Sequence, residues 1–76
     1  MSNKEGKLFY DGKTGRYDIL FEDGSIYGGL HCGNCFDYFT ADGWKPTRIE
    51  YAHGNNKGWY LIESHVRTLD GLTVRL

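Results

Sequence analysis

Four Asp-Gly pairs divide the chain, and their positions restrict its fold more than any other feature. The pairs are Asp11-Gly12, Asp23-Gly24, Asp42-Gly43 and Asp70-Gly71. Aspartate tolerates left-handed backbone geometry and glycine adopts it freely, so each pair suits a hairpin turn. The apolar runs between the pairs have β character, and none is long enough for an ordinary helix. The sequence therefore predicts short strands that turn back on one another.

Alternation of apolar and polar side chains locates the strands. They are expected at residues 8–10, 16–21, 35–40, 44–51, 59–62 and 72–76. Residues 26–27 are expected to pair back onto the second strand, in which Asp18 faces away from the apolar side. Residues 28–33 contain too many glycines for a long strand and are interpreted as a bulged or turning segment. The spacing of residues 62, 66 and 69 predicts one helical turn.

The strand at residues 44–51 has the clearest pattern. Thr47 and Ile49 are expected to point inward, whereas Arg48 and Glu50 point outward, because successive side chains of a strand lie on opposite faces. Pro46 cannot donate a hydrogen bond to a neighbouring strand. This end of the strand is therefore expected at an edge or a bulge.

The length and connections of the chain predict one small β domain. In a chain of 76 residues we expect residues 1–6 to be disordered and residues 7–76 to form the domain. The two Trp, six Tyr and four Phe residues supply large side chains for its core. Short hairpins leave no room for the crossovers that parallel strands need, so the sheet is antiparallel. Because such a sheet hides its edges by curling, the predicted architecture is a partly open SH3-like barrel.

The charge balance argues against two classes of partner. The formal net charge is −1, and residues 1–40 carry four Lys or Arg against six Asp or Glu. This balance disfavours nucleic acid as a partner and gives no polybasic membrane contact. Residues 1–7 are polar and do not resemble a signal peptide, and no apolar stretch approaches the ~20 residues that cross a bilayer. We therefore expect a cytoplasmic monomer that does not contact a membrane.

Four sequence blocks resemble a known protein family. They read LHCGNCFDYF, GWKPTRIEY, GWYLI and DGLTVRL, and the most specific part is residues 44–50. From Gly12 onward the chain resembles a family of small bacterial proteins with no assigned function. Such proteins are often encoded on integrative and conjugative elements or transposons of Gram-positive bacteria. The resemblance implies a genomic context and supplies no catalytic residue or ligand.

The segment His31–Cys35 is the cluster most suggestive of chemistry. Its Cys-x-x-Cys spacing can offer two thiolates to Zn²⁺, which then needs two further nitrogen or sulfur ligands. Beyond the neighbouring His31, the candidates are His53 and His65, which are not closely spaced. Reduced thiols without a cofactor are therefore the favoured interpretation for Cys32 and Cys35, and zinc is the alternative. A thioredoxin-like role is disfavoured because the chain lacks the βαβ context of that motif.

A binding surface is predicted around the outward-facing residues of the best strand. Combinations of aromatic side chains with arginine are typical of binding hot spots. The candidates are Trp44, Lys45, Arg48, Glu50, Lys57, Trp59 and Tyr60. In the alternative interpretation both tryptophans belong to the core and Arg48 stacks on one of them.

The sequence contains no arrangement typical of an enzyme. It has no Gly-rich phosphate loop that leads into a helix, and the spacing of its Ser, Cys and His residues indicates no nucleophile–base pair. The leading hypothesis is a non-enzymatic module that binds an unidentified protein and serves as an accessory factor of a mobile element. One alternative is a barrel that binds nucleic acid weakly through aromatic side chains. The other is a zinc-stabilised structural domain.

Overall fold

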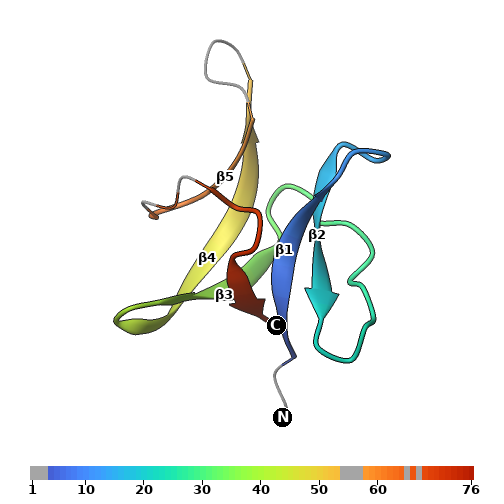
Figure 1. Ribbon diagram of the computed structural model, residues 1–76. Helices are drawn as coiled ribbons and strands as arrows, with labels where there is room; N and C mark the ends of the chain where they lie inside the picture. Colours follow the sequence, from blue (N-terminus) through green and yellow to red (C-terminus); the bar gives the residue numbers. More distant parts are fainter. Residues whose placement is uncertain (1–3, 54–57, 65, 67) are drawn as a thin grey trace.

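The structure is a single six-stranded antiparallel sheet with a strong twist (Figure 1). The computed structural model describes residues 4–53, 58–64, 66 and 68–76. The strands are β1 (Glu5–Asp11), β2 (Arg16–Phe21), β3 (Cys35–Thr40), β4 (Gly43–Ala52), β5 (Gly58–Leu61) and β6 (Thr73–Arg75). The predicted mainly β, antiparallel fold is confirmed.

Strand β6 joins two parts of the sheet that are distant in the sequence. The sheet order is β2-β1-β6-β3-β4-β5. The pairs β1–β2, β3–β4 and β4–β5 are neighbours along the chain, but β6 lies between β1 and β3. Val74 of β6 is opposite Gly6 on one side and Tyr38 on the other, and it is fully buried. These three residues of β6 therefore connect an N-terminal hairpin to a three-stranded unit.

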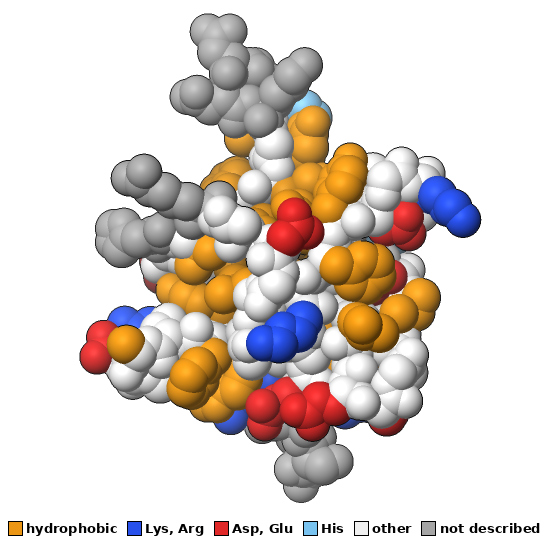
Figure 2. Space-filling model, in the orientation of Figure 1, with side chains coloured by type: hydrophobic (Ala, Val, Ile, Leu, Met, Phe, Trp, Pro, Cys, Tyr) orange, Lys and Arg blue, Asp and Glu red, His pale blue; other side chains and the backbone are white. Residues whose placement is uncertain are grey.

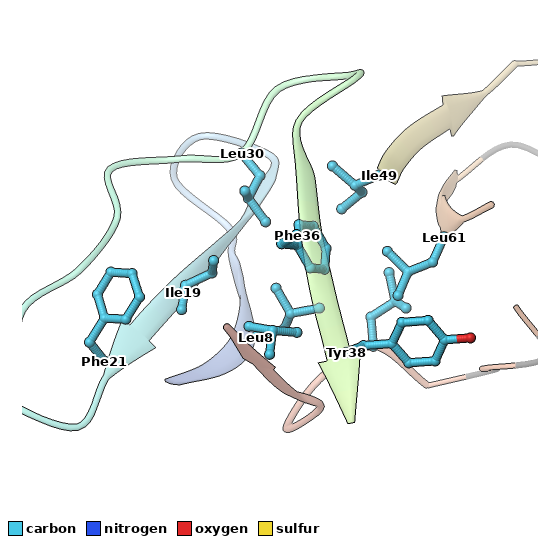
Figure 3. Close-up of a cluster of buried hydrophobic side chains, with 10 residues drawn as sticks. Leu8, Ile19, Phe21, Leu30, Phe36, Tyr38, Ile49 and Leu61 are labelled. Atoms are coloured by element: carbon cyan, nitrogen blue, oxygen red, sulfur yellow. The ribbon is translucent and has the colours of Figure 1, made fainter. Parts of the chain in front are cut away.

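The core lies on one face of the sheet, which we call the inner face. Leu8, Phe36 and Ile49 come from three different strands and point toward one another in Figure 3. Two core leucines, Leu30 and Leu69, come from the connections between strands. The core comprises Leu8, Ile19, Phe21, Leu30, Phe36, Tyr38, Ile49, Leu61, Leu69 and Val74. The opposite face of the sheet is called the outer face.

All four Asp-Gly pairs lie at turns, as the sequence predicts. Gly24, Gly43 and Gly71 have φ values of +89°, +105° and +84°, in the left-handed region that glycine adopts freely. After Asp11-Gly12 the left-handed residue is Gly15, with φ of +72°. The first turn therefore extends to Gly15 before β2 begins.

The connection between β2 and β3 folds back along the free side of β2. Ile26 forms an isolated bridge with Leu20, which confirms the predicted pairing. Asp18, expected to face away from the apolar side of β2, is only 4% exposed. Its Oδ1 accepts hydrogen bonds from the backbone N–H groups of Ile19 (2.8 Å) and Gly28 (2.9 Å). The polar side of β2 is therefore covered by backbone at Asp18, which does not contradict its predicted side of the strand.

The sheet is not closed into a barrel. Within the described part of the chain, the terminal strands β2 and β5 do not pair with each other. They are instead linked by side chains, since Trp59 Nε1 donates a 2.9 Å hydrogen bond to the carbonyl of Gly15. The Arg16 guanidinium carbon lies 6.0 Å from the centroid of the Trp59 ring. The sequence predicts a partly open barrel, and in the described residues the backbone pairing between β2 and β5 is absent altogether. The likeness of the curved sheet to an SH3 barrel stays a prediction.

Pro46 lies on an uncovered stretch of β4, which agrees with its predicted position. Ile49 exchanges backbone hydrogen bonds with Gly33 and Asn34 on the β3 side. The backbone N–H and C=O groups of the even-numbered residues of β4 therefore point to the other side of the strand, toward β5. Strand β5 pairs with β4 only from Ile49 to Ala52. The nitrogen of Pro46 therefore points to an edge that β5 does not reach.

Two boundaries differ from those expected. Lys4 exchanges two backbone hydrogen bonds of 3.0 Å with Leu76, and β1 starts at Glu5, so residues 4–6 belong to the sheet rather than to a tail. The predicted helical turn at residues 62–69 is wrong for the described residues, which form turns and irregular structure. No helix among the described residues is long and apolar enough to cross a membrane.

Candidate functional site

The outer face of β3, β4 and β6 carries an aromatic–arginine group, which we call the outer cluster (Asp37, Phe39, Trp44 and Arg75). Phe39 is opposite Trp44, and their rings meet edge to face with centroids 5.2 Å apart. The Arg75 guanidinium carbon lies 4.4 Å from the centroid of the Trp44 ring, and its Nε donates a 3.1 Å hydrogen bond to Asp37 Oδ2. Phe39 remains 52% exposed. The cluster therefore holds an arginine in place beside an exposed ring.

A groove of about 480 Å³ adjoins the outer cluster. Cys35, Pro46 and Arg48 line it together with Arg75. The Arg48 Nε lies 2.8 Å from Glu50 Oε2, so both arginines of the groove are paired with carboxylates. On the face shown in Figure 2, hydrophobic side chains form several patches with separate acidic and basic side chains between them. The groove thus combines apolar surface with balanced charge.

Four of the predicted binding residues share the outer face. Trp44, Arg48 and Glu50 alternate with the buried Thr47 and Ile49 along β4. Tyr60 of β5, 46% exposed, is opposite Glu50 on the same face. The alternation pattern of β4 therefore placed Arg48 and Glu50 correctly.

The remaining predicted residues do not join this surface. Lys45 is opposite Tyr38, which belongs to the inner face, so its placement with Arg48 was wrong. Trp59 packs against the core from the inner face, which places it away from Trp44. Lys57 lies outside the described residues.

The arginines that contact the tryptophans differ from the one expected. Arg75 lies over Trp44 and Arg16 over Trp59, whereas Arg48 pairs with Glu50. Alternation at residues 72–76 already separates Arg75 from Val74, but it does not say which strand lies next to β6. Arg75 was missed because its neighbour, β3, is far away in the sequence.

The two cysteines line different hollows of the surface. Cys35 lines the groove beside the outer cluster, and Cys32 lines a second cavity near Trp59. Both thiols are free and exposed. Across the described ranges, no group of three or more His, Cys, Asp or Glu side chains is arranged to hold a metal ion. His65 lies outside those ranges. The described residues therefore give the zinc hypothesis no support.

The second cavity, which we call the seam pocket, lies where the sheet fails to close. Its volume is about 320 Å³, and it lies between the β1–β2 turn and the far end of the β4–β5 pair. Tyr51, His53 and Trp59 line one side, with Arg16 from the other. The Tyr51 ring meets the rings of His53 and Trp59 edge to face, each at a centroid distance of 5.0 Å.

The comparisons with known proteins give a family and a fold. A family model described as a domain of unknown function, DUF5348, matches residues 6–76. The chain belongs to this family. A crystal structure of a Ruminococcus gnavus protein is similar to this DUF5348 chain at 57% sequence identity and a TM-score of 0.83. The similarity covers 95% of this chain and 99% of that one. No curated protein matches the sequence.

Membership of DUF5348 agrees with the sequence resemblance to a family without an assigned function. The similar crystal structure has the same fold. The association with mobile elements remains an expectation from the resemblance.

Proposed function

We propose that this DUF5348 protein is a non-enzymatic module that binds another protein through the outer face of β3, β4 and β6. The single observation that carries the proposal is the outer cluster. Binding hot spots are enriched in tryptophan and arginine, and Phe39 adds an exposed ring beside them. Asp37 and Trp44 hold the Arg75 side chain in place, so binding would cost little of its conformational entropy.

The charge of this face supports a protein partner over a nucleic acid. Phosphate-driven binding depends on basic side chains that neutralise phosphates and so release the counterions condensed on the nucleic acid. On the outer face, Arg48 and Arg75 are each within ion-pair distance of a carboxylate, Glu50 and Asp37. A mixed surface of this kind instead matches the polar rim and apolar centre of protein interfaces.

The biological setting belongs to the same proposal. The resemblance to small proteins of mobile elements supports an accessory or regulatory role for such an element, exerted in the cytoplasm. The genes beside the coding sequence would test this setting directly. Neighbours with no mobile-element function would contradict it without affecting the binding proposal.

The binding proposal is tested by capture and then by direct measurement. The wild-type protein, Arg75→Ala and the control Ile26→Ser are each used to capture proteins from the host lysate. Ile26 is 57% exposed but lies beside β2, away from the outer cluster. A captured protein is then purified, and its affinity for each of the three variants is measured.

We expect Arg75→Ala to lose about 30-fold in affinity, because hot-spot truncations cost about 2 kcal/mol or more. Ile26→Ser should bind as tightly as the wild type. Circular dichroism checks that the three variants have the same fold. Equal affinities of wild type and Arg75→Ala would refute the role of the outer cluster.

A further inference from the structure

The seam pocket has features that the outer face lacks. It lies on the inner side of the sheet, where β5 meets the β1–β2 turn without backbone pairing. Pockets at the open end of curled β-sheets are frequent sites for small ligands, and about 300 Å³ is the lower end of their size range. At about 320 Å³ the seam pocket is large enough for one compact ligand. Any ligand here would bind independently of the outer cluster.

The electrostatic character of the pocket is basic. Among the described residues, Arg16 is the only lining side chain that carries a permanent charge, and no described aspartate or glutamate lines the pocket. In the part of the chain that the structure describes, the Arg16 guanidinium has no carboxylate within ion-pair distance, in contrast to Arg48 and Arg75. Its Nη1 donates one weak hydrogen bond of 3.4 Å to the carbonyl of Leu30. The guanidinium therefore keeps donors for an anion.

The opposite side of the pocket is aromatic. Tyr51 and Trp59 both line the pocket and meet edge to face. Arg16 lies over the Trp59 ring, 6.0 Å from its centroid, which is the outer limit of a cation–π contact. Aromatic faces of this kind stack on planar rings, and stacking contributes about 1–3 kcal/mol per base in single-strand complexes.

We propose that the seam pocket binds a single nucleotide unit, with its base against Tyr51 and Trp59 and its phosphate on Arg16. Arginine binds phosphate oxygens with two parallel hydrogen bonds, which suits the one unpaired guanidinium of the pocket. The unit is either a free nucleotide or one residue of a single strand. Because the outer cluster takes no part, this inference goes beyond the protein-binding function and does not depend on it.

The two tryptophan indoles provide an internal control for the test. ¹⁵N-labelled protein is titrated with the four nucleoside monophosphates, with adenosine, with inorganic phosphate and with a short oligothymidylate. The Trp59 indole N–H, which donates to Gly15, reports on the seam pocket. The Trp44 indole, on the outer face, reports on unrelated binding. Arg16→Gln is compared with Arg48→Gln, which alters an arginine outside the pocket.

We expect nucleoside monophosphates to shift the Trp59 indole saturably while the Trp44 indole stays in place. Adenosine should bind the wild-type protein at least about tenfold more weakly than the nucleotides do. Each nucleotide should likewise bind Arg16→Gln at least about tenfold more weakly than it binds the wild type. In both cases a hydrogen bond to a charged group is lost. Arg48→Gln should match the wild type. A markedly tighter oligothymidylate identifies single strands as the source of the unit, and equal affinity identifies free nucleotides.

Three results would overturn the proposal. The first is an unmoved Trp59 indole at millimolar nucleotide and oligonucleotide. The second is the same response to inorganic phosphate alone, which would leave the aromatic side without a role. The third is equal affinity of AMP and adenosine for the wild-type protein, a comparison that holds even if Arg16→Gln fails to fold.

Discussion

Replacement of Gly6 by alanine tests the packing of β1 more sharply than any other single change. Gly6 lies in the middle of the sheet, opposite Phe21 on β2 and Val74 on β6. A Cβ atom at this position would lie 2.5 Å from the carbonyl oxygen of Leu20 and 2.7 Å from Ile19 Cγ2. The backbone of Gly6 does not have a positive φ, so the expected effect is steric rather than conformational.

The size of the effect follows from two opposing contributions. At an unobstructed site, Gly→Ala stabilises a protein by about 0.4–1 kcal/mol, because the unfolded chain loses conformational freedom. At Gly6 the methyl group meets a backbone oxygen of the adjacent strand, and overpacking of this kind costs about 1–3 kcal/mol or more. The sheet hydrogen bonds hold that oxygen in place, so relief requires the strands to separate. We therefore expect a net destabilisation.

Thermal unfolding followed by circular dichroism measures this effect. For a domain of this size, 1 kcal/mol changes Tm by about 4–8 °C. Gly12→Ala is the matched control, because its Cβ would meet nothing within 4 Å and its φ is not positive. Its Tm should stay equal or rise slightly, while that of Gly6→Ala falls. Equal Tm values for Gly6→Ala and the wild type would show that the strands do not pack as closely as described.

Two further predictions concern polar groups on β2, the buried Asp18 and the partly buried Tyr17. Asp18→Ala should lower stability by about 1–3 kcal/mol in urea unfolding, because the N–H of Gly28 loses its acceptor; an unchanged midpoint would contradict the role of this carboxylate. Burial, aided by the Asp70 carboxylate and Tyr10, raises the pKa of Tyr17 above its ordinary value of 10.0. The folded state then holds this proton more tightly than the unfolded chain, so stability is full below pH 10 and declines as pH rises beyond it. Tyr17→Phe should show a smaller alkaline decline in Tm than the wild type, and an identical decline would refute the assignment.

The turns and most strands could be predicted because their signals are local. Each Asp-Gly pair marks a turn through its own backbone preferences, and residues 16–21 and 35–40 form strands with the predicted bounds. The position of β6 could not be predicted in this way. Alternation shows that Val74 and Arg75 face opposite sides, but the choice of β1 and β3 as neighbours depends on long-range pairing.

The candidate site was predicted only in part, because local signals do not show which strands lie side by side. Arg48, Glu50 and Trp44 follow from alternation along one strand, which is a local property. Phe39 meets Trp44 through the pairing of β3 with β4, whereas Arg75 completes the outer cluster only because β3 and β6 lie beside each other. The hydrogen bond from Gly28 to Asp18 likewise depends on a loop ten residues away, which alternation along β2 does not locate.

The central place of β6 has a consequence for how the protein is made. The β1–β2 hairpin and the three-stranded β3–β5 unit both precede Thr73–Arg75 in the chain, and β6 pairs with both. Until β6 has been synthesised, the nascent polypeptide holds two incomplete pieces with apolar surface exposed, and native assembly waits for this strand. Synthesis that stops just short of Thr73 would therefore leave a product that needs a chaperone rather than a slightly shorter domain.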